Sequence, residues 1–309
     1  YTSGASESNN LAIKGIAQAS RNTGRHMIST VLEHASVGGT LTALQQQGWE
    51  VDLLDIQRDG TIDLEQLGDL LRKDTILVSV CAVDSELGTV QPIRKITEIL
   101  EDFPNCRLHV DATQAIGKTE LVMDGVDTMS IAPHKFYGLN GSGLLLKKSS
   151  LIIEPQTHGG SSTTPYRSGT PALALAVSIE KALQLTLTQQ EERIRYVRQL
   201  NEYLKTALLH YPAVRINSPE GAVPHILNLS VQGLKGTVFQ RVLSERGVCV
   251  SVKSACSAEG TPSKAVFAVS GDRKNALSSG RVSLSHLTTR EELDEFLQVF
   301  DQCYKELGP

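Results

Sequence analysis

The first half of the chain alternates short apolar runs, rich in β-branched residues, with segments of helical periodicity. Parallel strands need a crossover connection between them, so this alternation favours an α/β fold with a mostly parallel central sheet flanked by helices. The predicted strands are 26–30, 49–54, 76–80, 108–110 and 143–146, and the helix-like segments between them include 7–20, 64–71 and 93–100.

The second half suggests a smaller C-terminal α/β domain. A helical pattern runs from about residue 171 to 209 without turn signals, which is typical of a spine between domains. Strand-like runs restart at 226–230 and 248–251. We place the boundary near residue 210, giving a large domain over 1–210 and a small one over 211–309. The chain has no initiator Met and opens as if inside a domain, so we expect a missing N-terminal segment.

Composition excludes several classes of function. A net charge of -4 and a pI near 6.1 give no electrostatic reason for direct binding to nucleic acid. No apolar run is long enough to span a bilayer and no signal peptide is evident, so we expect a cytoplasmic protein without membrane contact. The five cysteines show neither CxxC nor metal-ligand spacing, which argues against a metal site or a disulfide scaffold.

Two charged residues follow predicted strands. Lys135 comes after the apolar stretch 126–132 and before the Gly-rich stretch 138–143, where we expect it to be buried. Burial lowers an amine's pKa and makes it a better nucleophile toward carbonyls, although many such lysines simply end a strand at the surface. Asp111 follows 108–110 and is either a helix N-cap or a carboxylate that keeps a pyridinium nitrogen protonated. Ligands of open α/β sheets bind at this edge, so both groups can meet there.

Two further segments are candidates for chemistry. The small residues of 3–9 lead into a helix whose first N–H groups suit a phosphate. Cys256 lies in a polar, small-residue segment typical of a mobile loop, where nearby Lys253 favours the thiolate. In contrast, Cys81, Cys106 and Cys249 are predicted to be small core hydrophobes.

Taken together, the motifs resemble the cysteine desulfurases of the class V aminotransferase family, which are fold type I enzymes dependent on pyridoxal 5′-phosphate. The resemblance covers nearly the whole chain, because the motifs occur in the family's order. They are 2–9, Glu33-His34, 86–92, 111–114, 134–138, 167–170, 254–257 and 281–283.

The resemblance implies roles around the cofactor ring. Lys135 would bind pyridoxal phosphate covalently, and its released amine would act as a catalytic base. Asp111 would pair with the pyridinium nitrogen, and Gln114 would contact the ring hydroxyl. His34 would stack on the ring and count among the catalytic residues, although a lone histidine is more often structural.

The resemblance also implies a phosphate site. Ala5, Ser6 and His134 would bind the phosphate, and Thr170 would reach it from the partner subunit of a homodimer. No metal is implied.

On the substrate side, Arg281 would grip the carboxylate of L-cysteine, and Ser85 would lie beside the substrate. The Cys256 thiolate would take the substrate's sulfur as a persulfide and leave L-alanine. A sulfur-acceptor protein would then collect the sulfur, as in iron–sulfur assembly or tRNA thiolation.

Four departures from the family pattern keep alternatives open. Ser85 stands at a usual Asn, Ala132 at a usual Ser or Thr, and Lys253 at a usual Gly; stretch 159–163 reads Gly-Gly-Ser-Ser-Thr in place of Gly-Gly-Gly-Gln-Glu. Each lost hydrogen bond costs about 0.5–1.5 kcal/mol. The alternatives are another class V enzyme, namely a selenocysteine lyase or an aminotransferase, and an impaired paralogue with a binding or scaffold role.

Overall fold

The computed structural model describes residues 1–160, 164–252 and 260–308. The chain forms two compact units, each of which draws on more than one stretch of sequence. Unit 1 comprises Tyr1–Asp55, Ile62–Val83 and Gln91–Thr188, and unit 2 comprises Ile56–Thr61, Asp84–Val90 and Gln189–Pro309. The domain boundary near residue 210 stays a prediction.

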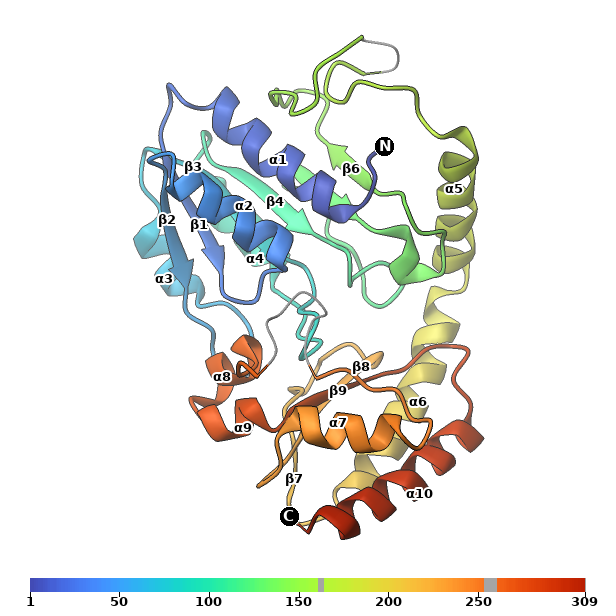
Figure 1. Ribbon diagram of the computed structural model, residues 1–309. Helices are drawn as coiled ribbons and strands as arrows, with labels where there is room; N and C mark the ends of the chain where they lie inside the picture. Colours follow the sequence, from blue (N-terminus) through green and yellow to red (C-terminus); the bar gives the residue numbers. More distant parts are fainter. Residues whose placement is uncertain (161–163, 253–259, 309) are drawn as a thin grey trace. The chain divides into compact units, whose positions relative to one another are not determined.

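Unit 1 is built on a six-stranded sheet of order β2-β1-β3-β4-β5-β6, in which only the edge strand β6 is antiparallel (Figure 1). Every residue of β3 is buried, as expected for a parallel strand covered on both faces. The predicted α/β class is therefore confirmed. The strands are β1 (His26–Thr30), β2 (Glu50–Leu54), β3 (Thr75–Cys81), β4 (Arg107–Asp111), β5 (Thr128–Ile131) and β6 (Leu144–Lys147).

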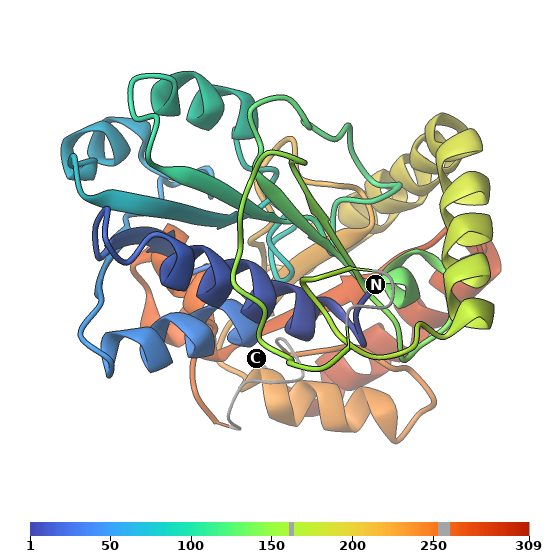
Figure 2. The ribbon, with the colours of Figure 1, turned by 90° about the horizontal axis from the view of Figure 1, so that it is seen from above.

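Helices cover both faces of this sheet. Figure 2 shows α1 and α2 on one face and α3 and α4 on the other. Apolar residues of α1 and α2 form a buried cluster with Met27 of β1 and with Ile76 and Leu77 of β3. The helical elements of unit 1 are α1 (Ala5–Ala19), α2 (Ala35–Gln45), α3 (Leu64–Leu70), α4 (Ile93–Leu100), the 3₁₀ turn η1 (Pro133–Phe136) and α5 (Leu173–Thr188).

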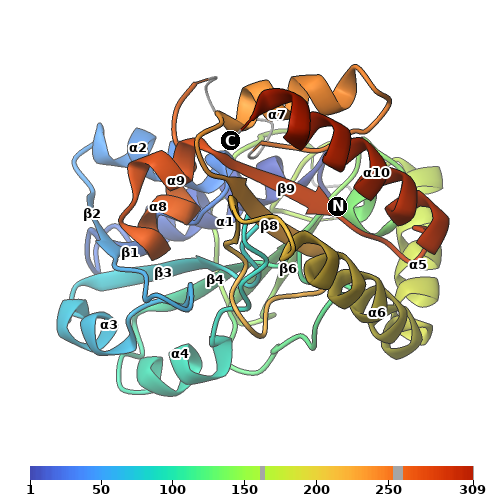
Figure 3. The same ribbon diagram turned by 90° about the horizontal axis from the view of Figure 1, so that it is seen from below.

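Unit 2 is a three-stranded antiparallel sheet of order β7-β8-β9 with helices packed beside it (Figure 3). Its core centres on Phe300, which is 0% exposed and lies 5.1 Å from the ring centroids of both Tyr211 and Phe239. The elements are α6 (Gln190–Leu208), β7 (Val214–Ile216), β8 (Ile226–Val231), α7 (Gly236–Ser244), α8 (Lys264–Ser270), α9 (Arg273–Leu277), β9 (Ser279–Ser283) and α10 (Arg290–Leu307).

The structure corrects three sequence-based expectations. The single helix over 171–209 is two helices, because Gln189 leaves the helical region with φ -107° and ψ 10°. The strand over 248–251 is reduced to one bridge between Ser251 and Arg281. Without that strand Cys249 is exposed, so its assignment to the core was wrong, whereas Cys81 and Cys106 are buried as predicted. Within the described part of the chain, no helix is long and apolar enough to cross a membrane.

Candidate active site

Asp111 lies at the carboxyl end of β4 and is buried. Its Oδ1 accepts a hydrogen bond from the Thr113 backbone N–H at 2.9 Å, and its Oδ2 accepts one from Asn9 Nδ2 at 2.8 Å. The carboxylate is thus held by donors on two sides at the sheet edge where ligands of open α/β folds bind. The bond to Thr113 shows that Asp111 also caps its own turn.

Asn9 is the centre of a buried polar network that the sequence reasoning missed. Its Oδ1 lies 3.0 Å from His109 Nε2, and His109 Nδ1 lies 2.9 Å from Thr128 Oγ1. Burial lowers the pKa of His109 to about 4, although the charge of Asp111 acts in the opposite direction. The neutral imidazole then donates to Asn9 through Nε2, which turns the Asn9 amide nitrogen toward Asp111. The only sequence signal was an asparagine on the apolar face of α1.

The same network reaches His34. Asn9 Nδ2 also donates to Ser36 Oγ at 2.9 Å, and His34 Nδ1 accepts from the Ser36 backbone N–H at 3.1 Å. His34 is the N-cap of α2, so helix formation fixes the position of its ring. Because Nδ1 is an acceptor, the proton of the neutral ring lies on Nε2. The structure therefore connects Asp111 and His34 through Asn9 and Ser36.

Lys135 lies in η1, the turn that follows β5. Contrary to expectation, its side chain is exposed. The 3₁₀ turn carries the chain out of the sheet, so that Phe136, 1% exposed, fills the core instead. Tyr137 ends the turn in the left-handed region at φ 71°, a strained conformation for a residue with a side chain. Burial and the adjacent Lys135 charge lower the pKa of His134, which is also exposed.

The structure also describes the surroundings of four other predicted residues of unit 1, namely Ala5, Ser6, Gln114 and Thr170. Ala5 and Ser6 form the first turn of α1, and no side-chain bond caps this end at Gly4. Gln114 Oε1 accepts from Lys118 Nζ at 2.6 Å. Thr170 of the same chain lines an open cavity of about 420 Å³ whose lining includes residues of the first three positions and of α5.

Unit 2 brings Arg281 and Ser85 together. Arg281 Nη1 donates to the Ser85 backbone carbonyl at 2.7 Å, and Nη2 lies 3.4 Å from Ser251 Oγ. Burial lowers the pKa of Arg281, and the charges of Glu86 and Asp84 oppose that shift. Its Nε is buried without a hydrogen-bond partner among the described residues. The contact uses the backbone carbonyl of Ser85 and not its side chain. It therefore does not depend on the Asn that the family usually has at this position.

The turn that carries Ser85 is held by a buried acid. Asp84 Oδ2 accepts the Glu86 backbone N–H at 3.1 Å and also that of Leu87. Burial and the charge of Glu86 together raise the pKa of Asp84 to about 7, against the backbone hydrogen bonds and the charge of Arg281, which lower it. Glu86 Oε2 in turn accepts from Ser263 Oγ at 2.5 Å.

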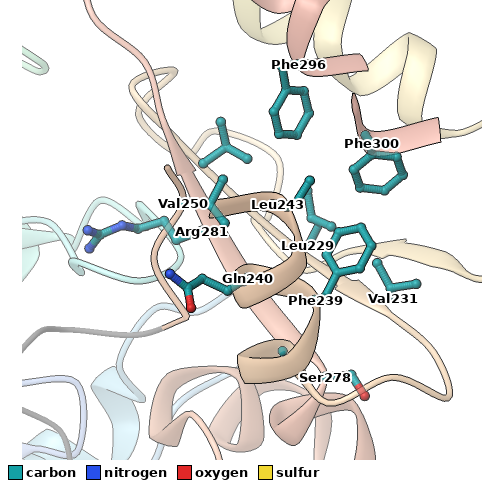
Figure 4. Close-up of a pocket in the computed structure, with 13 residues that line it drawn as sticks. Leu229, Val231, Phe239, Gln240, Leu243, Val250, Ser278, Arg281, Phe296 and Phe300 are labelled. Atoms are coloured by element: carbon teal, nitrogen blue, oxygen red, sulfur yellow. The ribbon is translucent and has the colours of Figure 1, made fainter. Parts of the chain in front are cut away.

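A small cavity behind Arg281 has a different character. Its free volume of about 20 Å³ has room for one water-sized molecule, and its wall is apolar, with Leu229, Phe239 and Phe296 among the lining residues. Figure 4 shows the guanidinium directed away from this apolar cluster. The cavity is a packing gap of the unit 2 core, and Gln240, Ser278 and Arg281 are the few polar side chains among its lining residues.

Three predicted features fall outside the described residues: the nucleophile Cys256, its neighbour Lys253, and the departure at 161–163. Ala132 is described and buried, and it carries no hydroxyl. Among the described residues, no group of three or more His, Cys, Asp or Glu side chains is placed to hold a metal ion.

Residues 1–296 match the family model described as aminotransferase class-V. The chain belongs to the class-V aminotransferase family. It is 39% identical to the NifS/IcsS protein homolog of Lactobacillus delbrueckii subsp. bulgaricus, over 99% of this chain and 81% of the relative. It is 34% identical to the cysteine desulfurase IscS of Dictyoglomus turgidum, over 99% of this chain and 79% of the relative.

Solved structures agree. A NifS-like protein superimposes with a TM-score of 0.92 and 31% identity, covering 99% of this chain and 82% of that one. Within the class-V aminotransferases the chain is thus a cysteine desulfurase, and the resemblance inferred from its motifs is confirmed. These relatives do not favour a selenocysteine lyase, an aminotransferase or a scaffold.

Proposed function

We propose that this cysteine desulfurase takes the sulfur of L-cysteine as a persulfide on Cys256, using pyridoxal 5′-phosphate bound in unit 1. The observation that carries the proposal is the anchored carboxylate of Asp111 beside the strand that leads to Lys135. Asp111 pairs in register with Ser130 of β5, and Lys135 follows in the turn after that strand. A fixed anion and a lysine at one sheet edge suit a cofactor with a basic ring nitrogen and an aldehyde.

The residues present fit the cofactor. Thr113 Oγ1 and Ser130 Oγ are buried at this edge without hydrogen-bond partners among the described residues. Both hydroxyl groups can therefore form hydrogen bonds with a polar ligand. Lys135 is exposed on the turn that follows β5 at this edge. When bound, pyridoxal phosphate supplies the electron sink that stabilises a carbanion at the substrate's Cα.

Each residue of unit 1 then has a defined task. Asp111 holds the proton on the ring nitrogen, and Asn9 and Thr113 keep its carboxylate in place. His34, held in place as the N-cap of α2, would stack on the ring. Lys135 would hold the cofactor covalently, and its amine, when not so bound, would act as the base for the substrate's Cα proton.

The phosphate needs separate anchors. Ala5 and Ser6 offer N–H groups of the first turn of α1, where the helix dipole favours an anion. His134 adds a ring nitrogen, and in a homodimer Thr170 adds a hydroxyl across the interface. Gln114 serves the ring hydroxyl, in competition with its present bond to Lys118.

Arg281 binds the substrate carboxylate. Nη1 donates to the Ser85 carbonyl and one N–H of Nη2 to Ser251 Oγ, which fixes the guanidinium and leaves Nε and the second N–H of Nη2 to serve as donors. The Cys256 thiolate then forms an S–S bond with the substrate sulfur while the substrate's Cβ–S bond breaks. Protons return to the carbon skeleton, which leaves as L-alanine, and an acceptor protein takes the terminal sulfur.

The test is turnover of L-cysteine by the cofactor-loaded enzyme. Alanine is quantified directly, and the persulfide is located by alkylation and peptide mass mapping. We expect one labelled site, at Cys256, and no persulfide in Cys256→Ala. In Lys135→Ala we expect cofactor to be lost on gel filtration. A Cys256→Ala enzyme that releases alanine and sulfide at the wild-type rate would remove Cys256 from the mechanism.

A further inference from the structure

Glu33 is a carboxyl group that none of the roles above uses. It lies in the turn between β1 and α2, directly before His34. Its Oε1 accepts hydrogen bonds from Thr30 Oγ1 at 2.9 Å and from the Cys81 backbone N–H at 2.8 Å. Since Thr30 ends β1 and Cys81 ends β3, one oxygen atom ties two strand ends to the turn that carries His34.

The second oxygen of Glu33 has a different environment. Oε2 is shielded from solvent and has no hydrogen-bond partner in the part of the chain that the structure describes. An ionised carboxylate with an unpartnered buried oxygen is costly, whereas a neutral carboxylic acid is much less so. Burial and the charge of Asp111 together raise the pKa of Glu33 to about 8, against hydrogen bonds from Cys81 and Thr30 that lower it.

The groups that face Glu33 are consistent with a neutral acid. The described elements packed against it are β1, β3 and β4, and it precedes α2. The side chains of these elements that act on the Glu33 carboxyl are Asp111 on β4, Cys81 on β3 and Thr30 on β1, and the His34 ring lies beside it in the chain. The other titratable side chains of the three strands are His26 on β1 and Arg107 and His109 on β4, and none of them is among the principal groups that shift the pKa of Glu33. No cation among these principal groups offsets a charge on Glu33.

We propose that Glu33 is a positioning residue of the cofactor site, acting as a neutral carboxylic acid that holds His34 against the ends of β1 and β3. A neutral Glu33 adds no second negative charge beside Asp111, so Asp111 alone supplies the negative charge for the cofactor's ring nitrogen. The proposal rests on the proposed function, because the group that His34 and Asp111 receive is the cofactor. Glu33 itself touches neither cofactor nor substrate in this role.

The first test is equilibrium binding of pyridoxal phosphate to cofactor-free protein near neutral pH. In Glu33→Gln the amide oxygen still accepts both hydrogen bonds and the group carries no charge, so we expect affinity within about threefold of wild type. Glu33→Ala loses both bonds, so we expect binding weakened about tenfold or more. Glu98→Gln, an exposed glutamate of α4, is the matched control and should bind as wild type does.

The second test reads the protonation state directly. Infrared difference spectra of wild type should show a carboxylic-acid carbonyl band near neutral pH that fades above about pH 8–9 and is absent from Glu33→Gln. This readout does not depend on catalysis, and it remains decisive if Glu33→Ala fails to fold.

The outcomes are separable. Binding by Glu33→Gln as weak as that of Glu33→Ala, or absence of the infrared band in wild type, overturns the neutral acid. Wild-type affinity in Glu33→Ala overturns the positioning role. If wild type itself binds no pyridoxal phosphate, the proposed function fails, while the infrared band still reports on Glu33.

Discussion

Asp84 offers the sharpest test of the electrostatics of unit 2. The residue is 1% exposed, and its carboxylate accepts the backbone N–H groups of Glu86 and Leu87. In Asp84→Asn the side-chain oxygen can still accept these bonds, but the charge is removed. The substitution therefore separates the shape of the turn from the cost of burying an ion.

The magnitude follows from the raised pKa, about 7 in the folded protein against 3.8 for an ordinary aspartate. The folded state keeps the proton to higher pH than the unfolded chain does, so the stability from this group falls as pH rises from about 4 to about 7. Between about pH 5.5 and 8.5 the folded protein releases this proton after roughly 1.5 pH units, at its pKa of about 7, so the free energy of unfolding falls by about 2 kcal/mol. Asp84→Asn cannot show this loss.

The assay is urea unfolding of both proteins at these two pH values, followed by far-ultraviolet circular dichroism. The slope of unfolding free energy is about 1–3 kcal/mol per molar urea. The urea midpoint of Asp84→Asn, measured relative to that of wild type, should therefore be about 1 M higher at the higher pH than at the lower pH. Comparing the variants at each pH cancels the titration of all other groups. Glu295→Gln, an exposed site on α10, should show no such gain. A gap between Asp84→Asn and wild type that is the same at both pH values refutes the reasoning.

Three further predictions concern the two sites and the core. Asn9→Ala removes a hydrogen bond to the charged Asp111, worth about 1.5–3 kcal/mol, so pyridoxal phosphate should bind about 10- to 100-fold more weakly by fluorescence titration; unchanged affinity contradicts the network. Arg281→Lys cannot offer two parallel N–H groups, so the KM for L-cysteine should rise about tenfold with a smaller change in kcat, and a pure kcat effect argues against carboxylate binding. Phe300→Ala leaves a large cavity and should destabilise unit 2 by about 3–5 kcal/mol in urea unfolding. Phe300→Leu leaves a smaller cavity and should lose less stability, whereas equal losses would show that cavity size is not the cause.

The sequence by itself determined the local elements and the family. The predicted strand 26–30 and helix 93–100 have the bounds observed for β1 and α4, and the helix predicted at 64–71 ends one residue earlier in the structure. These elements are readable because a buried parallel strand is a short run of mostly apolar residues and a helix repeats its apolar face with a period of 3.6. The order of short motifs identified the family for a similar reason, since each motif is local.

Only the tertiary structure decided which residues share a site. Asn9 meets Asp111 and His109 because α1 packs across β4, and about 100 residues of chain separate these partners. Glu33 reaches Cys81 because β1 and β3 are neighbours in the sheet although β2 comes between them in sequence. Burial and hydrogen-bond partners across such distances depend on strand order and register, which no local pattern records. For the same reason the sequence predicted a buried Lys135, whereas the 3₁₀ turn after β5 exposes it and buries Phe136 instead.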